Sequence, residues 1–207
     1  MKSLVALAPL MLASLPLGQE SDKKTLMPTC AGCAAEARPM QDGHVATQWN
    51  LNVRYIPGVE KNARFRATAD FRITPRFTIG VETSSAPETL PRATWFVTPE
   101  SNDVPSVVLG VTADRLSTPK GEAIFLTLAK AIPGASVTPF VSAKYSTDEK
   151  RTYIPFGANF TFDKILLQAL YDGRKTHLIA THSFGNVNAN VIYARLQYLG
   201  FGLSVGF

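Results

Sequence analysis

The chain has 207 residues, of which 45% are hydrophobic, enough for one domain with a closed core. Lys and Arg number 21 against 16 Asp and Glu, giving a net charge of +5 and a pI near 9.3. The basic residues are spread along the chain rather than clustered, which argues against nucleic-acid binding. No internal stretch is long and apolar enough for a membrane-spanning helix.

The first residues predict export. One lysine, an apolar run over residues 4–17 and small residues after it form the pattern of a secretory signal peptide. Pro9 and Pro16 argue against a stable spanning helix. We expect residues 1–18 to be a signal peptide and residues 19–44 to be a flexible periplasmic leader.

Both cysteines, Cys30 and Cys33, lie in that leader as a C-x-x-C motif. Such a motif can be a redox pair, half of a metal site or a local disulfide. Zinc would require a second pair or nearby histidines, and a covalent haem would require His after Cys33, where Ala34 stands. We expect a local disulfide, with no metal or other cofactor.

From about residue 45 the apolar and polar residues alternate, which is the two-residue period of a strand with two different faces. In ARFRATADFRIT (residues 63–74) apolar side chains occupy the odd positions and polar side chains the even ones. Twelve strands are expected, at 45–56, 62–74, 76–84, 92–99, 105–115, 121–131, 137–147, 151–162, 164–173, 175–184, 187–196 and 197–207.

The connections and faces favour a transmembrane barrel. Very tight turns such as TPR, FDK and FGN alternate with longer loops such as PGVEKN and SSAPETLP, as they do in outer-membrane barrels. TPESNDV and AIPGAS are exceptions, because they fall at the end of the tight turns but are longer. The polar face is rich in Asn, Gln, Thr, Gly, Ser and Arg, and aromatic residues lie near strand ends. We predict an all-β fold over residues 45–207, an antiparallel up-and-down barrel of about 12 strands with both ends on the periplasmic side.

The final strand, LGFGLSVGF (residues 199–207), has Gly202, Val205 and Phe207 at the positions of a barrel-assembly signal, although Gly200 stands where a polar residue is usual. Residues 45–207 resemble bacterial outer-membrane β-barrel proteins. The resemblance implies an outer-membrane location, contact with outer-membrane lipid and recognition by the barrel-assembly machinery. PSVVLGVTADRL and GEAIFLTLAKAI also faintly resemble YjbH-like barrels associated with exopolysaccharide export.

Charged residues on the predicted inner face give the only direction toward a function. They come from the first four strands: Arg54, Arg64, Arg66, Asp70, Arg72 and Glu82, with Arg76 and Arg92 as further candidates. A basic lumen would favour small anionic solutes or bind an acidic ligand such as a polysaccharide. Alternatively, arginines and carboxylates form a ladder that fills and stiffens a narrow barrel.

No catalytic set is visible. His182 and Ser183 are neighbours in a strand and point to opposite faces, and His177 lies roughly 20 Å from Ser183 along the strand; the third histidine is His44. We predict a non-enzymatic channel or export accessory. The alternatives are an outer-membrane lipid-modifying enzyme and a soluble exported β-barrel that binds a ligand.

Overall fold

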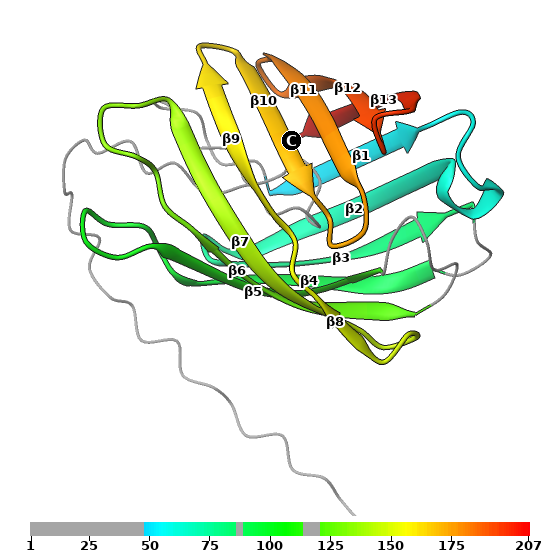
Figure 1. Ribbon diagram of the computed structural model, residues 1–207, viewed down its shortest axis with the longest axis horizontal. Helices are drawn as coiled ribbons and strands as arrows, with labels where there is room; N and C mark the ends of the chain where they lie inside the picture. Colours follow the sequence, from blue (N-terminus) through cyan, green and yellow to red (C-terminus); the bar gives the residue numbers. More distant parts are fainter. Residues whose placement is uncertain (1–47, 86–88, 114–120) are drawn as a thin grey trace, which may run out of the picture.

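The computed structural model describes residues 48–85, 89–113 and 121–207 (Figure 1). The predicted signal peptide, the leader with Cys30 and Cys33, and His44 lie outside these residues. Among the helices in the described part, none has the length and apolar character to cross a membrane.

In the described residues, thirteen antiparallel strands form a single sheet. They are β1 (Trp49–Tyr55), β2 (Phe65–Thr74), β3 (Phe77–Ser84), β4 (Thr89–Thr98), β5 (Ser106–Ala113), β6 (Glu122–Ala129), β7 (Val137–Ser146), β8 (Arg151–Tyr153), β9 (Phe156–Phe162), β10 (Ile165–Tyr171), β11 (Thr176–Phe184), β12 (Val187–Ala194) and β13 (Tyr198–Gly206). A short 3-10 helix, η1 (Lys61–Ala63), lies between β1 and β2.

The sheet closes on itself, because β1 pairs with β13 as well as with β2. Trp49 and Phe207 exchange two backbone hydrogen bonds of 2.8 and 3.0 Å at the seam. The predicted pairing of the last strand with the first is confirmed. Closure removes both sheet edges, so each strand has two neighbours to satisfy its backbone groups.

Two of the thirteen segments form one strand of the wall. β8 and β9 both pair with β7 and are separated by Ile154 and Pro155. Proline has no N–H to donate, which interrupts the ladder, while the Pro155 carbonyl still accepts from the Ser142 N–H at 2.7 Å. The fold is therefore a closed antiparallel barrel of 12 strands, as predicted.

The barrel has two unequal ends, here called the terminal rim and the loop rim. The terminal rim holds the start of β1, the end of β13 and two-residue turns such as 75–76, 163–164 and 185–186. The loop rim holds the connections 56–64, 147–150, 172–175 and 195–197. The β7–β8 hairpin extends past the loop rim at the lower right of Figure 1. The three predicted tight turns are present at the terminal rim, and the two exceptions, 99–105 and 130–136, lie at the same rim with seven residues each. Most strands are shorter than expected; β1 begins at Trp49 rather than residue 45.

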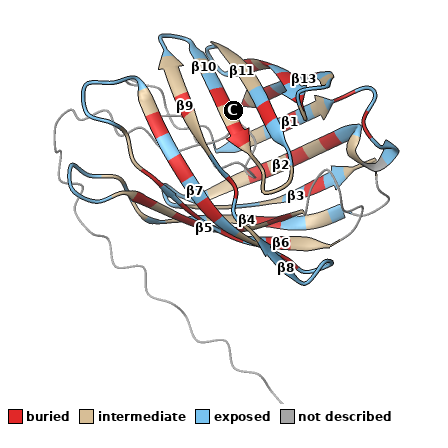
Figure 2. Cartoon of the chain, viewed as in Figure 1, coloured by how far each residue is buried: buried red, intermediate tan, exposed pale blue. Residues whose placement is uncertain are grey.

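The two-residue alternation separates an inner and an outer face, which appear as alternating colours along the strands in Figure 2. In β2, Arg66, Thr68 and Asp70 are buried. In β13, Gly200, Ser204 and Gly206 are buried while Phe201 and Leu203 are exposed. The assignment of polar side chains to the interior is thus correct for β1–β3 and β13.

The interior is not polar throughout, which differs from the prediction. Val108 and Phe125 are buried on the inner faces of β5 and β6, and Phe140 and Leu170 are buried on β7 and β10. Glycines make room for the rings, because a Cβ on Gly110 would lie 2.5 Å from Phe125. The same alternation that places polar groups inside thus also carries large apolar ones inside on the opposite wall.

Candidate functional site

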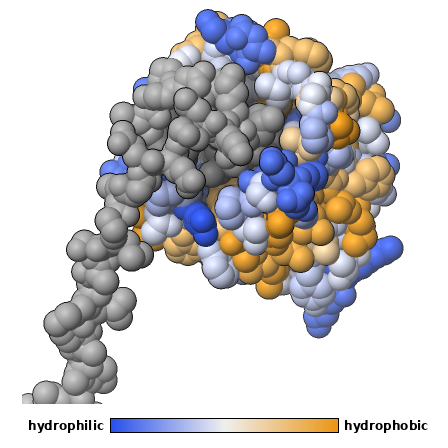
Figure 3. Space-filling view, turned by 90° about the vertical axis from the view of Figure 1, so that its left-hand side faces the viewer, coloured by the Kyte–Doolittle hydropathy of each residue, from blue (hydrophilic) through white to orange (hydrophobic). Residues whose placement is uncertain are grey.

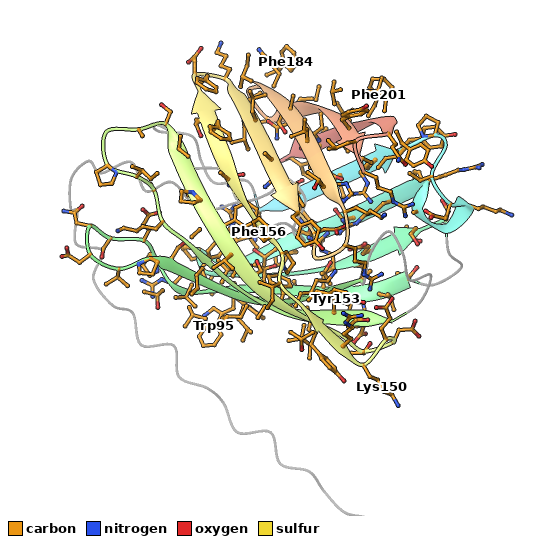
Figure 4. The ribbon with its side chains drawn as sticks, viewed as in Figure 1. Trp95, Lys150, Tyr153, Phe156, Phe184 and Phe201 are labelled. Atoms are coloured by element: carbon orange, nitrogen blue, oxygen red, sulfur yellow. The ribbon has the colours of Figure 1, made fainter. Side chains whose placement is uncertain are left out.

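The outer surface of the barrel is apolar. Large hydrophobic side chains are exposed along the outer faces of the strands, for example Leu203, Phe201 and Val191 at 50, 54 and 46%. Figure 3 shows hydrophobic residues spread over the outside of the wall, and in Figure 4 Trp95 and Phe184 project away from opposite walls. An exposed apolar surface of this extent is typical of proteins that contact lipid or a partner protein.

Aromatic rings lie on the outer face at both rims. At the terminal rim Trp49 packs on Phe71, with ring centroids 4.8 Å apart, and Phe77 pairs with Trp95 in register. At the loop rim Phe156 packs on Tyr171 at 5.3 Å. Amphipathic rings in two such bands are typical of proteins whose rims lie at a membrane–water interface.

Glu82 lies at the centre of a charged cluster on the inner wall. Its carboxylate accepts from Arg66 Nη2 at 2.5 Å and from Thr112 Oγ1 at 3.1 Å, and it lies 3.5 Å from Arg92 Nη1. Arg92 Nε lies 3.2 Å from Asp70 Oδ1. All four charged side chains are at most 5% exposed. The cluster joins β2, β3, β4 and β5 through the interior.

Gly80 makes the Asp70–Arg92 contact possible. The register places Gly80 opposite Asp70 on one side and opposite Arg92 on the other, so the arginine reaches across a strand position without a side chain. A Cβ at Gly80 would lie 2.2 Å from Asp70 Oδ1 and 2.4 Å from the Ala69 carbonyl. A side chain at Gly80 would therefore require the neighbouring strand to shift, and it would disturb the Asp70–Arg92 ion pair.

We therefore expect Gly80→Ala to destabilise the barrel by about 1–3 kcal/mol through overpacking. The measurement is the urea midpoint for refolding into detergent micelles. Gly202→Ala is the matched control, because the nearest atoms that its Cβ would meet are Asn190 Nδ2 at 3.1 Å and the Val53 carbonyl oxygen at 3.3 Å. Equal midpoints for the two variants would show that Gly80 is not needed for the contact.

The other predicted lumen arginines have different settings. Arg54 lies in β1 directly opposite Arg66, and Arg72 is half-buried near the terminal rim. Arg64 was expected on the inner wall but is exposed at the loop rim, because helix η1 displaces it from β2 and its Nε donates to the Val59 carbonyl at 3.1 Å. Arg76, a further candidate, is exposed in the β2–β3 turn.

The β1–β2 loop folds inward over the loop rim. Ile56 and Val59 are 1 and 2% exposed and pack with Ile192, Ala194 and Tyr198 from β12 and β13. At the loop's tip, Glu60 accepts two hydrogen bonds from Arg195, at 2.7 and 2.6 Å. The contact with Arg195 lowers the pKa of Glu60. The loop thus narrows the barrel on the side of β11–β13.

His177, on the inner face of β11, is fully used by its neighbours. Its Nδ1 accepts from the Arg195 N–H at 3.3 Å, so Nε2 carries the proton and donates to Asp172 Oδ2 at 2.9 Å. The other oxygen of Asp172 accepts from the N–H groups of Arg174 and Lys175, both at 2.8 Å. In the turn that carries Asp172, Gly173 takes a positive φ of 95°.

The pKa of Asp172 follows from these contacts. Burial acts to raise it, but the hydrogen bonds from His177 and from the two backbone N–H groups outweigh burial and lower the pKa from 3.8 to about 2. The fold therefore favours the ionised carboxylate. Its contribution to stability is complete above pH 3.8 and is lost as the pH falls to about 2.

We expect the barrel to lose about 2 kcal/mol from Asp172 between these pH values. Asp172→Asn is expected to lose that stability already at neutral pH and to respond less to acid over the same interval. Urea refolding midpoints of both proteins, recorded at about pH 6, 4 and 2.5, measure the difference. Parallel acid profiles would contradict the assignment.

A second ionic cluster ties the β7–β8 hairpin to the β10–β11 turn. Arg174 Nη2 lies 2.7 Å from Glu149 Oε2, and its guanidinium stacks 4.3 Å above the Tyr153 ring. The Tyr153 hydroxyl donates to the same carboxylate. Tyr153 and Lys150 mark this hairpin in Figure 4. The loop rim is thus held by side chains from neighbouring connections.

No converging nucleophile and base occur among the described residues singled out above. His182 lies on the outer face, 4.3 Å from the Phe184 ring, while Ser183 faces inward. The described residues also contain no group of three or more His, Cys, Asp and Glu side chains placed to hold a metal ion.

Sequence reasoning placed Asp70 and Glu82 on the inner face but treated them as isolated carboxylates. The structure brings both to Arg92, which was only a secondary candidate. Sequence reasoning also missed the Asp172–His177 pair. A usable signal was present for the second pair alone: an acidic turn residue stands five positions before a histidine.

These features define the class of the chain as a closed antiparallel 12-stranded β-barrel with an apolar outside and a charged cluster inside. No protein-family model matches the chain, and no curated protein matches it. Among solved structures it is similar to three variants of the Rh. blastica porin, with 16, 16 and 15% identity and TM-scores of 0.36, 0.35 and 0.35. Each match covers 69% of this chain and 55% of the porin chain, so this chain spans about half the length of those porins.

Proposed function

We propose that the protein is an integral outer-membrane β-barrel that forms a narrow, non-enzymatic channel favouring small anions. The observation that carries the membrane assignment is the inversion of faces: exposed apolar rows outside and buried Arg, Asp, Glu, Asn and Thr inside. A soluble sandwich or cup has the opposite arrangement. Closure of the sheet supports the proposal, because an open edge could not be satisfied in lipid.

In this proposal the terminal rim faces the periplasm and the loop rim faces outward. Residues 45–207 are then the membrane domain, preceded by the signal peptide and leader. Gly202, Val205 and Phe207 would be read by the assembly machinery before the barrel closes. An export role for polysaccharide is the alternative use of the same lumen.

The charge of the inner wall supports an anion preference. The inner face of β1–β4 carries four arginines and two carboxylates. They are Arg54, Arg66, Arg72 and Arg92, and Asp70 and Glu82. The excess of positive charge would attract anions and repel cations. The burial of the Glu82 cluster favours a second candidate, a filled structural barrel that does not conduct.

Planar-bilayer recording separates the two candidates. We expect discrete conductance steps, and under a KCl gradient a reversal potential displaced toward that of chloride. Absence of conductance from protein that shows heat-modifiable gel migration would sink the channel proposal and favour the filled barrel. A displacement toward the potassium potential would contradict the anion preference alone.

A further inference from the structure

Two arginine side chains face each other inside the barrel. Arg54 of β1 and Arg66 of β2 are directly opposed in the strand register, and both lie on the inner face. Like charges directly opposite in a sheet destabilise it. An arrangement of this kind requires a negative group between or beside them.

The described residues do not supply enough negative charge at this point. Arg66 Nη2 is bound to Glu82, but Arg66 Nε and Nη1 are buried without a hydrogen-bond partner, and so is Arg54 Nε. Arg54 makes no hydrogen bond or ion pair within the described residues. Glu82 already receives Arg66, Arg92 and Thr112. A buried cation without a partner is costly, and each such group in a native protein calls for an ion or water.

The space beside Arg54 is bordered by a further donor. Opposite Arg54 on β13 stands Gly202, which has no side chain. On the next strand Asn190 is 6% exposed, and its Nδ2 lies 3.1 Å from where a Gly202 Cβ would be. Its Oδ1 is occupied by the Thr181 hydroxyl at 2.7 Å, which turns the amide N–H groups toward that space. N–H donors from β2, β1 and β12 thus border one region of the lumen.

We propose that Arg54 and Arg66 form a binding site for a small oxyanion of the phosphate or carboxylate class. The free guanidinium N–H groups match such oxygens in number and geometry, since arginine donates two parallel hydrogen bonds to an oxyanion. The site deepens the proposed function, because it rests on a lumen that solutes can enter. It names the class of anion that the channel would hold.

The test is a titration of the refolded full chain in detergent with inorganic phosphate, at constant ionic strength balanced by chloride, read by calorimetry. Saturable binding is expected for the wild type. Arg54→Gln is expected to weaken it about 10-fold to 100-fold, the effect of losing charge-assisted hydrogen bonds. Arg54→Lys keeps the charge but not the paired donors, so its phosphate affinity should lie between that of the wild type and that of Arg54→Gln. Arg76→Gln, an equal charge change in an exposed turn, should leave the affinity unchanged.

Arg54 is the residue to replace because it makes no ion pair that folding needs, and heat-modifiable migration verifies each variant. No saturable phosphate binding by folded wild type, or equal affinity for wild type and Arg54→Gln, would overturn the site. Conductance is measured in parallel so that the two proposals fail separately. A barrel that conducts without binding phosphate contradicts the site alone, and one that binds phosphate without conducting contradicts the channel alone.

Discussion

Replacing Glu82 with glutamine is expected to destabilise the barrel by about 3–5 kcal/mol, the usual cost of removing one partner from a buried ion pair. Glu82 is 3% exposed and is the shared acceptor for Arg66, Arg92 and Thr112. Without its charge, Arg66 loses the carboxylate that it contacts at 2.5 Å, and Arg92 loses one of its two carboxylate contacts. The loss should exceed that of any single neutral substitution on the inner wall.

Urea midpoints for refolding into micelles measure this effect, with Glu122→Gln as the control. Glu122 is half-buried at the start of β6 by the loop rim, and its replacement should change stability by less than about 1 kcal/mol. The double variant Glu82→Met with Arg66→Met should recover part of the loss, because it removes both charges together. If Glu82→Gln and Glu122→Gln give the same midpoint, the cluster does not stabilise the barrel.

A charge on the outer face is expected to produce the second large effect. Leu203 lies near the middle of β13, opposite Val53 and Ala189, and is 50% exposed. In a membrane, Leu203→Arg should destabilise the barrel by about 2–4 kcal/mol, since an arginine at mid-depth in lipid must leave water. In a soluble barrel the same change would be nearly neutral or favourable.

Thr152→Arg provides the depth control for that variant. Thr152 is an exposed residue of β8, in the hairpin that extends past the loop rim. Its change to arginine should cost only about 0–1 kcal/mol, the value for positions near the interface. Both variants are compared in lipid vesicles by urea unfolding. Similar stabilities for the two would contradict a lipid-facing position of Leu203.

The class of fold could be predicted because a two-residue alternation needs no knowledge of neighbours. Leu199, Phe201 and Leu203 alternate with small residues, and this alone assigns their face. Closure was also predictable, since a last strand with an apolar row cannot remain an open edge in lipid.

Side-chain partners could not be predicted, because they depend on the register between strands. Asp70 pairs with Arg92, which lies two strands away across Gly80, and only the register of β2, β3 and β4 brings the two residues together. Arg64 left the inner wall because helix η1 ends beside it. Phe125 and Phe140 lie inside because glycines on adjacent strands leave room for their rings. The sequence of one strand does not show which residue of the next strand lies beside it.

The most direct test of a lipid-facing outer surface uses the two native tryptophans. Trp49 and Trp95 are the only tryptophans of the chain, and both lie on the outer face at the terminal rim, 43 and 49% exposed. The folded protein is reconstituted in vesicles whose acyl chains carry bromine, and tryptophan fluorescence is recorded with and without aqueous acrylamide. A membrane barrel predicts strong quenching by brominated lipid, strongest for bromine near the headgroup, and weak quenching by acrylamide. Fluorescence that brominated lipid leaves unchanged and acrylamide quenches would contradict the membrane barrel.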